Sequence, residues 1–280
     1  MARIRGLDMA RLLLLLGFSV LILGLSASAW GDLANPRAWE QSQLQQRQQN
    51  WPGWTLPGPV SRPGADNDLF YPLWFEGIWA VESRNPDHPD DAPLRHQARF
   101  QRNSAGRIVA DRAFNAEAIG RAQLGEQLLR VEDDPSSANR QLTLLRGDRS
   151  LESTVVGRGQ QTINDREFLA NELVVQIMRG PGGAPRISRI ETLSSFRGCV
   201  QKNGENLDPA AVQKLRSDGL WAAAIDPEQI NAEQIYVEQI YIEQWQARYP
   251  GPGESLSASP LSTSHYQLTL TPLQDPLQKG

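Results

Sequence analysis

The three histidines are the residues of this chain best suited to acid–base chemistry, because imidazole titrates near neutral pH. His88 lies in a proline-rich turn, whereas His96 and His265 lie in or beside expected strands. The last two would form a catalytic site if they met a carboxylate such as Glu167 or Glu172. The sequence contains no Gly-x-Ser-x-Gly elbow, phosphate loop, His-Glu-x-x-His or Cys-x-x-Cys motif. We therefore expect no enzyme and no cofactor; a haem held by an axial histidine is the alternative.

A second group of chemically capable residues lies in the loop 85–93, with the sequence NPDHPDDAP. Its three aspartates and one histidine are potential metal ligands. However, the same residues alternate with three prolines, and Asp, Asn and Pro together are typical of turns. Calcium sites need a more regular alternation of oxygen ligands. We therefore expect turns here and no metal site.

Large aromatic side chains crowd into one stretch, residues 68–84, with the sequence DLFYPLWFEGIWAVESR. Each aromatic ring buries a large area, so this block is expected to lie in a core or in a ligand pocket. Gly77 precedes the first strand-like run and lets another backbone segment approach Trp79 closely. The rest of the chain must therefore provide elements that enclose this block.

Short strands joined by local turns are the elements expected to enclose it. There is no alternation of strands and long helices, so a doubly wound sheet is excluded and an antiparallel, mainly β barrel is favoured. A sheet that closes on itself leaves no edge strands, which matters in a chain whose only cysteine is Cys199. The expected hairpins are 95–102 with 107–111, 140–145 with 151–156, and 168–178 with 187–200. Further strands are expected at 77–83, 228–247 (alternatively a helix) and 266–270, and short helices at 116–125 and 208–217.

Gly77-Ile78-Trp79 at the head of the first strand resembles the Gly-x-Trp signature of lipocalins and their calycin relatives. The resemblance implies an up-and-down barrel in which Trp79 plugs one end and packs beneath an arginine from a late strand. Arg248 and Arg197 are the two candidates for this arginine. The chain departs from the lipocalin pattern in its length, its lack of disulfides and an extra aromatic arm before the barrel.

The N-terminus has the features of an export signal. A basic start precedes the apolar run 12–25, and Ala27-Ser28-Ala29 provides a cleavage pattern. The run is shorter than the roughly 20 residues that span a membrane; an uncleaved N-terminal anchor is the alternative. We expect a signal peptide at 1–29, an extended Pro/Gly/Trp-rich arm at 30–67, and a barrel domain at 68–275.

The charge and composition of the mature chain limit its partners. Removal of the signal lowers the formal net charge from −4 to −6, because three arginines and one aspartate leave with it. Such a chain lacks the basic face of a nucleic-acid-binding protein. We expect a monomer in which Trp51 and Trp54 of the arm dock on the outside of the fold or plug one end of it; contact with a partner or a membrane is the alternative.

A broader resemblance covers most of the mature chain. The strings WPGWTLPGP, DLFYPLWFEGIW, ADRAFNAEAIG and FLANELVVQ resemble an uncharacterised family of exported cyanobacterial proteins with relatives in the chloroplast thylakoid lumen. The resemblance implies a home in the periplasm or the thylakoid lumen. It supplies no activity, and so no functional residue is carried over from it.

The expected barrel is suited to binding a small apolar ligand of the lipid, pigment or quinone class. A different possibility is that the aromatic rings only fill the interior. The alternative function is that of an assembly or interaction factor that docks on a photosynthetic membrane complex. The candidate lining residues are Trp74, Phe75, Trp79 and Phe100, with Phe114 or Tyr241 closing the site.

Overall fold

The computed structural model describes residues 36–55, 57–64, 67–202, 205–206, 237–253 and 259–273. The expected signal at 1–29, the expected helix at 208–217 and the first part of the expected strand 228–247, residues 228–236, lie outside these residues. The helical elements are α2 (Pro36–Gln49), η1 (Leu73–Phe75), α3 (Arg112–Leu124) and η2 (Gly125–Gln127). The strands are β1 (Gly77–Arg84), β2 (Leu94–Arg102), β3 (Ile108–Ala110), β4 (Leu128–Asp134), β5 (Ser137–Leu145), β6 (Arg149–Asn164), β7 (Glu167–Arg179), β8 (Arg186–Lys202), β9 (Glu205–Asn206), β10 (Val237–Pro250) and β11 (Ser262–Pro272).

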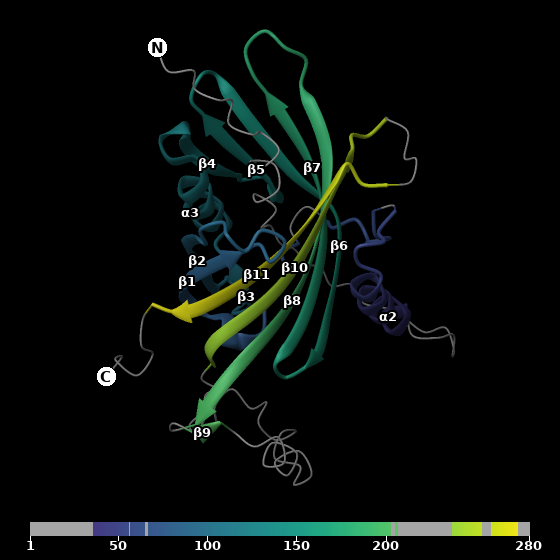
Figure 1. Ribbon diagram of the computed structural model, residues 1–280, viewed down its shortest axis with the longest axis vertical. Helices are drawn as coiled ribbons and strands as arrows, with labels where there is room; N and C mark the ends of the chain where they lie inside the picture. Colours follow the sequence, from purple (N-terminus) through teal and green to yellow (C-terminus); the bar gives the residue numbers. More distant parts are fainter. Residues whose placement is uncertain are drawn as a thin grey trace.

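Ten of these strands form one antiparallel sheet that curls into a half-barrel (Figure 1). Their order is β3-β2-β1-β11-β10-β8-β7-β6-β5-β4, and β9 adds a short pair to the end of β8. The mainly β, antiparallel, lipocalin-like architecture expected from the sequence is thus confirmed. The first strand, β1, pairs with the last, β11, which brings the aromatic block beside the C-terminal end of the sheet.

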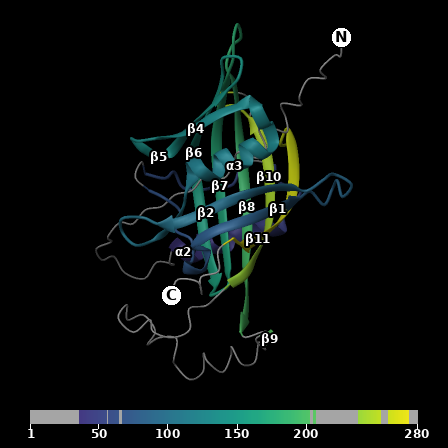
Figure 2. The same ribbon diagram turned by 90° about the vertical axis from the view of Figure 1, so that its left-hand side faces the viewer.

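The sheet does not close on itself, contrary to the expected cylinder. Its two ends are β3 and β4, which do not pair with each other within the described residues. Instead α3, which connects them in sequence, packs against both β2 and β4 (Figure 2). Asp111 caps this helix by accepting a hydrogen bond from the Phe114 backbone N–H. The gap in the barrel is therefore covered by side-chain packing rather than by a ladder of backbone hydrogen bonds.

The three expected hairpins are confirmed as β2–β3, β5–β6 and β7–β8. In the second of them, three residues, Arg146–Asp148, join the paired Leu145 and Arg149, and Gly147 and Asp148 both have positive φ. The strand β4 was not predicted. Its sequence, LLRVEDD, ends in acidic residues that favour a loop reading, and two register irregularities interrupt its pairing with β5.

The arm is not wholly extended as predicted, because Pro36–Gln49 forms the helix α2. Gln, Arg and Leu are good helix formers, and proline is tolerated in the first turn. The predicted docking on the outside of the fold is confirmed. Trp54 is only 2% exposed and packs with Leu44 against Leu169 and Leu193 of the sheet. In Figure 1, α2 lies on the opposite side of the long strands from α3.

Two apolar clusters fill the concave side of the sheet. The first, the aromatic cluster, contains Tyr71, Phe75, Trp79, Phe100, Phe168 and Phe196 together with aliphatic neighbours. The second, the aliphatic cluster, contains Ala116, Ile119, Leu128, Val131, Leu145, Leu151, Met178 and Ile190. Since Phe168 and Met178 stand at opposite ends of β7, polar residues of the central strands occupy the level between the two clusters.

Candidate functional site

A buried ion pair lies at the centre of the concave face. The pairing of β6 with β7 shifts register between Val155 and Gly157, and this bulge turns Arg158 inward, directly opposite Glu172. Both side chains are buried. Nε of Arg158 donates to Oε1 of Glu172 at 2.8 Å, and Nη2 donates to the same oxygen.

The ion pair begins a row of polar side chains that crosses five strands. Glu172 pairs in register with Thr192 of β8, Thr192 with Gln246 of β10, and Gln246 with Ser264 of β11. Positions in register on adjacent antiparallel strands share one face of a sheet. We call Arg158, Glu172, Thr192, Gln246 and Ser264 the polar belt.

Several polar atoms of the belt lack a hydrogen-bond partner among the described residues. They are Oγ1 of Thr192, both amide atoms of Gln246, and Nη1 of Arg158. Gln246 is completely buried (0% exposed). A buried polar group without a partner costs roughly 1–3 kcal/mol, so such groups require an explanation. A ligand or ordered water that supplies the partners is the simplest one.

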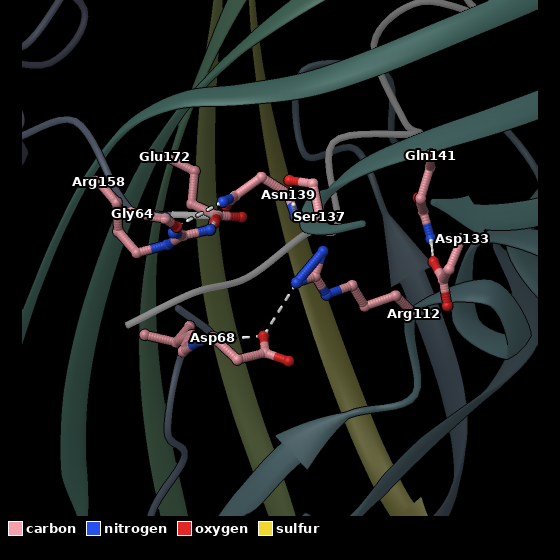
Figure 3. A network of polar contacts seen from close by, with 10 residues as sticks. Gly64, Asp68, Arg112, Asp133, Ser137, Asn139, Gln141, Arg158 and Glu172 are labelled. Atoms are coloured by element: carbon pink, nitrogen blue, oxygen red, sulfur yellow. Dashed lines mark hydrogen bonds and ion pairs between the residues drawn. The ribbon is translucent and has the colours of Figure 1, made fainter. Parts of the chain in front are cut away.

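A second charged pair faces the belt from across the interior. Asp68 comes from the segment before η1, and Arg112 is the first residue of α3; their side chains approach to 3.2 Å. Figure 3 shows this pair beside Arg158 and Glu172. Two arginines and two carboxylates from four parts of the chain thus meet inside the half-barrel.

Burial changes the protonation of the carboxyl groups. It raises the pKa of Glu172 to about 7, although Arg158 acts in the opposite direction. It also raises the pKa of Asp68 to about 6, against the effect of Arg112. The arginines stay charged at neutral pH. The four groups therefore gain net positive charge as the pH falls through the neutral range.

The aromatic residues predicted to line a ligand site are packed against one another. Tyr71, Phe75 and Phe100 have ring centroids 4.7–4.9 Å apart, and Phe168 and Phe196 complete the cluster. Trp79 is buried, and its Nε1 donates to the Phe75 carbonyl oxygen. These rings fill the end of the barrel, so the structure favours the plain-core alternative for them.

The other predicted lining residues lie further out. Trp74 is half-buried, stacks on Phe75 and donates from Nε1 to the Asp165 carbonyl oxygen. Phe114 lies beneath the guanidinium of Arg99. Tyr241 was predicted to close the barrel, but it is 45% exposed on the convex face, where its hydroxyl donates to Gln239. Its position on β10 alternates with the inward-facing Ile240 and Ile242, which explains the error.

Neither candidate arginine packs on Trp79 in the described contacts. Arg197 is exposed and pairs with Glu167. Arg248 is eight residues beyond Ile240 on β10, roughly 26 Å along the strand at the usual rise per residue. Ile240 pairs with Leu270, close to the β11 residues that face Trp79, so Arg248 lies at the far end of the sheet.

His96 and His265, considered as a conditional acid–base pair, lie on opposite faces of the sheet. His96 pairs with Val81 on the concave face, whereas His265 alternates with the inward-facing Leu268 and Leu270 and so lies on the convex face. There it stacks on Trp245 and contacts Glu243 at 2.5 Å. The predicted turns at 85–93 are present, and no group of possible metal ligands occurs within the described residues.

A separate polar centre fixes the arm to the convex face. Glu191, 0% exposed, accepts hydrogen bonds from Arg47 at 2.7 Å, the Gly58 N–H at 3.0 Å, Asn171 at 2.9 Å and the Tyr249 hydroxyl at 3.2 Å. A cavity of about 20 Å³ lies beside it, room for about one water molecule. Because its acceptor atoms are satisfied by the protein, this centre serves attachment of the arm.

Sequence reasoning missed the polar belt, although β7 carries a signal for it. Phe168, Glu172, Gln176 and Met178 have even numbers and share a face with buried apolar residues. In such a strand, polar residues lie on the same face as the large apolar residues. This pattern indicates that polar side chains are buried in the interior. The bulge in β6 hides the matching position of Arg158, because it breaks the alternation there.

A family model described as "Domain of unknown function (DUF6816)" matches residues 63–273. The chain belongs to the DUF6816 family. No curated protein and no solved structure matches it. The matched DUF6816 segment contains the polar belt and the Asp68–Arg112 pair, whereas α2 and Trp54 precede it. The described residues contain no helix that is both long and apolar enough to cross a membrane.

Proposed function

We propose that this protein binds a small amphipathic molecule, of the lipid, pigment or quinone class, inside its curled sheet. The observation that carries the proposal is the set of buried, unpartnered polar atoms on Thr192 and Gln246, within the described residues. A ligand carbonyl would accept from the Gln246 amide, and a ligand hydroxyl would donate to it. Retaining such groups at a cost in stability is expected where they serve binding.

The position of the belt indicates the character of the ligand. The aromatic cluster lies on one side of the belt and the aliphatic cluster on the other. A molecule seated at this level would meet hydrogen-bonding groups across the sheet and apolar side chains above and below. The ligand is therefore amphipathic rather than purely apolar, and it lies at the polar belt rather than within the aromatic cluster.

The gap between β2 and β4, which α3 covers, is the route by which we expect a ligand to enter. This helix covers the gap between β2 and β4 through side-chain contacts, which include hydrogen bonds of Asn115 with the Arg99 backbone and of Arg121 with the carbonyl oxygens of Leu128 and Leu129. Displacing it breaks no backbone ladder, whereas opening the sheet elsewhere would break a row of hydrogen bonds. We also infer from the N-terminal sequence that the protein works after export, in the periplasm or the thylakoid lumen.

The alternative function, docking on a membrane complex through the tryptophans of the arm, has less support. Trp54 is buried against the protein's own sheet, and its Nε1 donates to the Arg47 carbonyl oxygen. A side chain used in this way is not available as an anchor for a partner. Ligand binding is therefore the function that the geometry favours.

Binding of two neutral probes, dodecanol and a decyl-substituted benzoquinone, tests the proposal by calorimetry and native mass spectrometry. We expect a one-to-one complex with at least one probe, and a loss of affinity of about tenfold or more in the Thr192→Val/Gln246→Leu double variant, since each lost hydrogen bond counts for about 1 kcal/mol. Gln97→Leu is the matched control, because Gln97 is exposed on the outer side of β2. Failure of both probes to bind, or equal binding by the double variant, would refute the proposal.

A further inference from the structure

The guanidinium of Arg158 has an unused donor inside the half-barrel. Its Nε and Nη2 are engaged by Glu172, whereas Nη1 is buried and has no partner among the described residues. Arginine presents its N–H groups in a planar fork that suits carboxylates. Nη1 therefore lacks an acceptor, and a negatively charged oxygen is the acceptor that a buried guanidinium binds most strongly.

We propose that the polar belt receives the carboxylate head group of an amphipathic acid, held by Nη1 of Arg158. This inference rests on the proposed ligand-binding function and specifies the chemistry of its ligand. The apolar part of the acid would contact the neighbouring clusters, and the head group would supply the acceptor that Nη1 of Arg158 lacks within the described residues.

The charges around Arg158 support an anion. Arg112 is the second cation, and Asp68 and Glu172 are the carboxylates that counter the two. Asp133 is a further carboxylate whose charge acts on Asp68, and the Tyr71 hydroxyl is a titratable group on which Glu172 and Asp68 act. Tyr71 stays neutral, because burial keeps its pKa well above the ordinary value. When Glu172 is protonated, Arg158 loses the charge of its hydrogen-bonded partner, and only the more distant carboxylate of Asp68 still acts on it.

Binding of the acid should therefore be coupled to uptake of one proton by Glu172. The carboxylate of the ligand replaces the charge of Glu172 beside Arg158, and Glu172 is retained as a neutral hydrogen-bonding group. Since burial raises the pKa of Glu172 to about 7, the protein with protonated Glu172, the form that binds the acid, predominates at pH 6 and is the minor form at pH 8. Linkage then predicts an affinity about tenfold higher at pH 6 than at pH 8.

Calorimetry with dodecanoate and dodecanol at pH 6 and pH 8 tests the inference on the full chain. Carboxylic acids titrate near about pH 4–5 in water, so dodecanoate stays ionised at both values. We expect dodecanoate to bind at least about tenfold more tightly than dodecanol at pH 6, as a charge-assisted hydrogen bond implies. This preference should decrease about tenfold at pH 8, while dodecanol binding should not change.

Two variants locate the effect. Glu172→Gln should lose most of the difference in dodecanoate affinity between pH 6 and pH 8, because the amide keeps an acceptor for Arg158 but has no charge. The titration of Asp68 accounts for the remainder. Arg158→Gln/Glu172→Gln replaces the ion pair by a neutral pair of similar shape and should lose the preference for the acid. The control is Arg197→Gln/Glu167→Gln, which removes an exposed pair on the convex face.

The outcomes separate this inference from the proposed function. Equal binding of dodecanoate and dodecanol would overturn the carboxylate site and leave ligand binding intact. A pH dependence of undiminished size in Glu172→Gln would overturn the coupling to Glu172. Absence of binding by every probe, neutral or acidic, would overturn both proposals. If the double variant does not fold, the pH profiles of the wild type and Glu172→Gln still test whether binding of the acid is coupled to Glu172.

Discussion

Arg158 and Glu172 face each other across β6 and β7 because β6 contains one extra residue between Val155 and Gly157. Without that bulge the alternation of β6 would point the arginine to the convex face. The extra residue thus creates a buried ion pair at the centre of the sheet, and the polar belt continues from it. A pair in such a place gives weak net stability but is costly to break.

The first prediction concerns the loss of one partner of this pair. Glu172→Ala leaves the Arg158 guanidinium buried and unpaired, and we expect the free energy of unfolding to fall by about 3–5 kcal/mol. Urea denaturation followed by tryptophan fluorescence measures the change. The control is Glu167→Ala, which breaks an exposed pair with Arg197 and should cost less than about 1 kcal/mol. Similar losses in the two variants would show that the pair is not effectively buried.

The second prediction concerns pH. The folded-state pKa of Glu172, about 7, lies above the ordinary value of 4.5, so the folded protein binds more protons than the unfolded one between these values. The stability contribution of this group is therefore present below about pH 4.5 and is lost as the pH rises through 7. Relative to Glu172→Gln, the wild type should lose up to about 3 kcal/mol between pH 5 and pH 8.

The comparison with the variant is essential because other buried groups also titrate. Asp68, with a pKa of about 6, changes stability in the same direction as Glu172. His96 has its pKa lowered by burial, so its contribution rises as the pH rises toward 6.5 and opposes them. Both remain in Glu172→Gln, so the effect of His96 cancels in the difference, whereas that of Asp68, whose charge acts on Glu172, cancels in part. Parallel stability curves for the two proteins would contradict the assigned pKa of Glu172.

The third prediction is that the belt lowers stability. Gln246→Met replaces a completely buried amide, unpartnered among the described residues, by an apolar side chain of similar length. We expect thermal and urea unfolding to show a gain of about 1–3 kcal/mol, since the desolvation penalty of the amide disappears. The same change at exposed Gln97 should alter stability by less than about 0.5 kcal/mol. A clear loss of stability would mean that ordered protein contacts or water already satisfy the Gln246 amide.

Local sequence signals predicted much of the sheet, and for physical reasons they did not predict its interior chemistry. The turn at Gly147 and Asp148 depends on residues adjacent in sequence, so the hairpin it joins could be recognised. The belt depends on register between strands far apart in sequence, such as Thr192 with Gln246. A one-residue bulge changes which side chains face inward, and nothing in the composition of β6 marks its position.

The incomplete closure of the barrel is another feature that local signals do not encode. Each strand resembles a strand of a closed barrel. Only the pairing partners of β3 and β4 distinguish a closed barrel from an open, curled sheet. The helix α3 was recognised from its composition, but its role in covering the gap depends on where β2 and β4 end in space. Trp79 is buried as the lipocalin resemblance implies, although its Nε1 donates to the Phe75 carbonyl oxygen and neither candidate arginine contacts it within the described residues.

The fourth prediction concerns attachment of the arm. Arg47→Met removes the cation that pairs with the fully buried Glu191 and lies over the ring of Trp54. The carboxylate keeps its bonds from Gly58 and Asn171 but loses its charge partner, so the segment around Trp54 should detach. We expect a red shift of tryptophan emission and faster proteolysis between Trp51 and Gly64, with a loss of about 2–4 kcal/mol.

A second variant tests the same attachment from the sheet side. A methyl group at Gly157 would lie 2.6 Å from a side-chain carbon of Val60, so Gly157→Ala should also loosen the arm while the ion pair of Arg47 is intact. Arg62→Met, at an exposed site on the same arm, and Gly183→Ala, where the added carbon meets open space, are the matched controls. If the arm stays protected in both Arg47→Met and Gly157→Ala, the apolar contacts of Trp54 and Leu44 alone hold it. Because the belt is on the other face of the sheet, ligand binding should persist in every one of these variants.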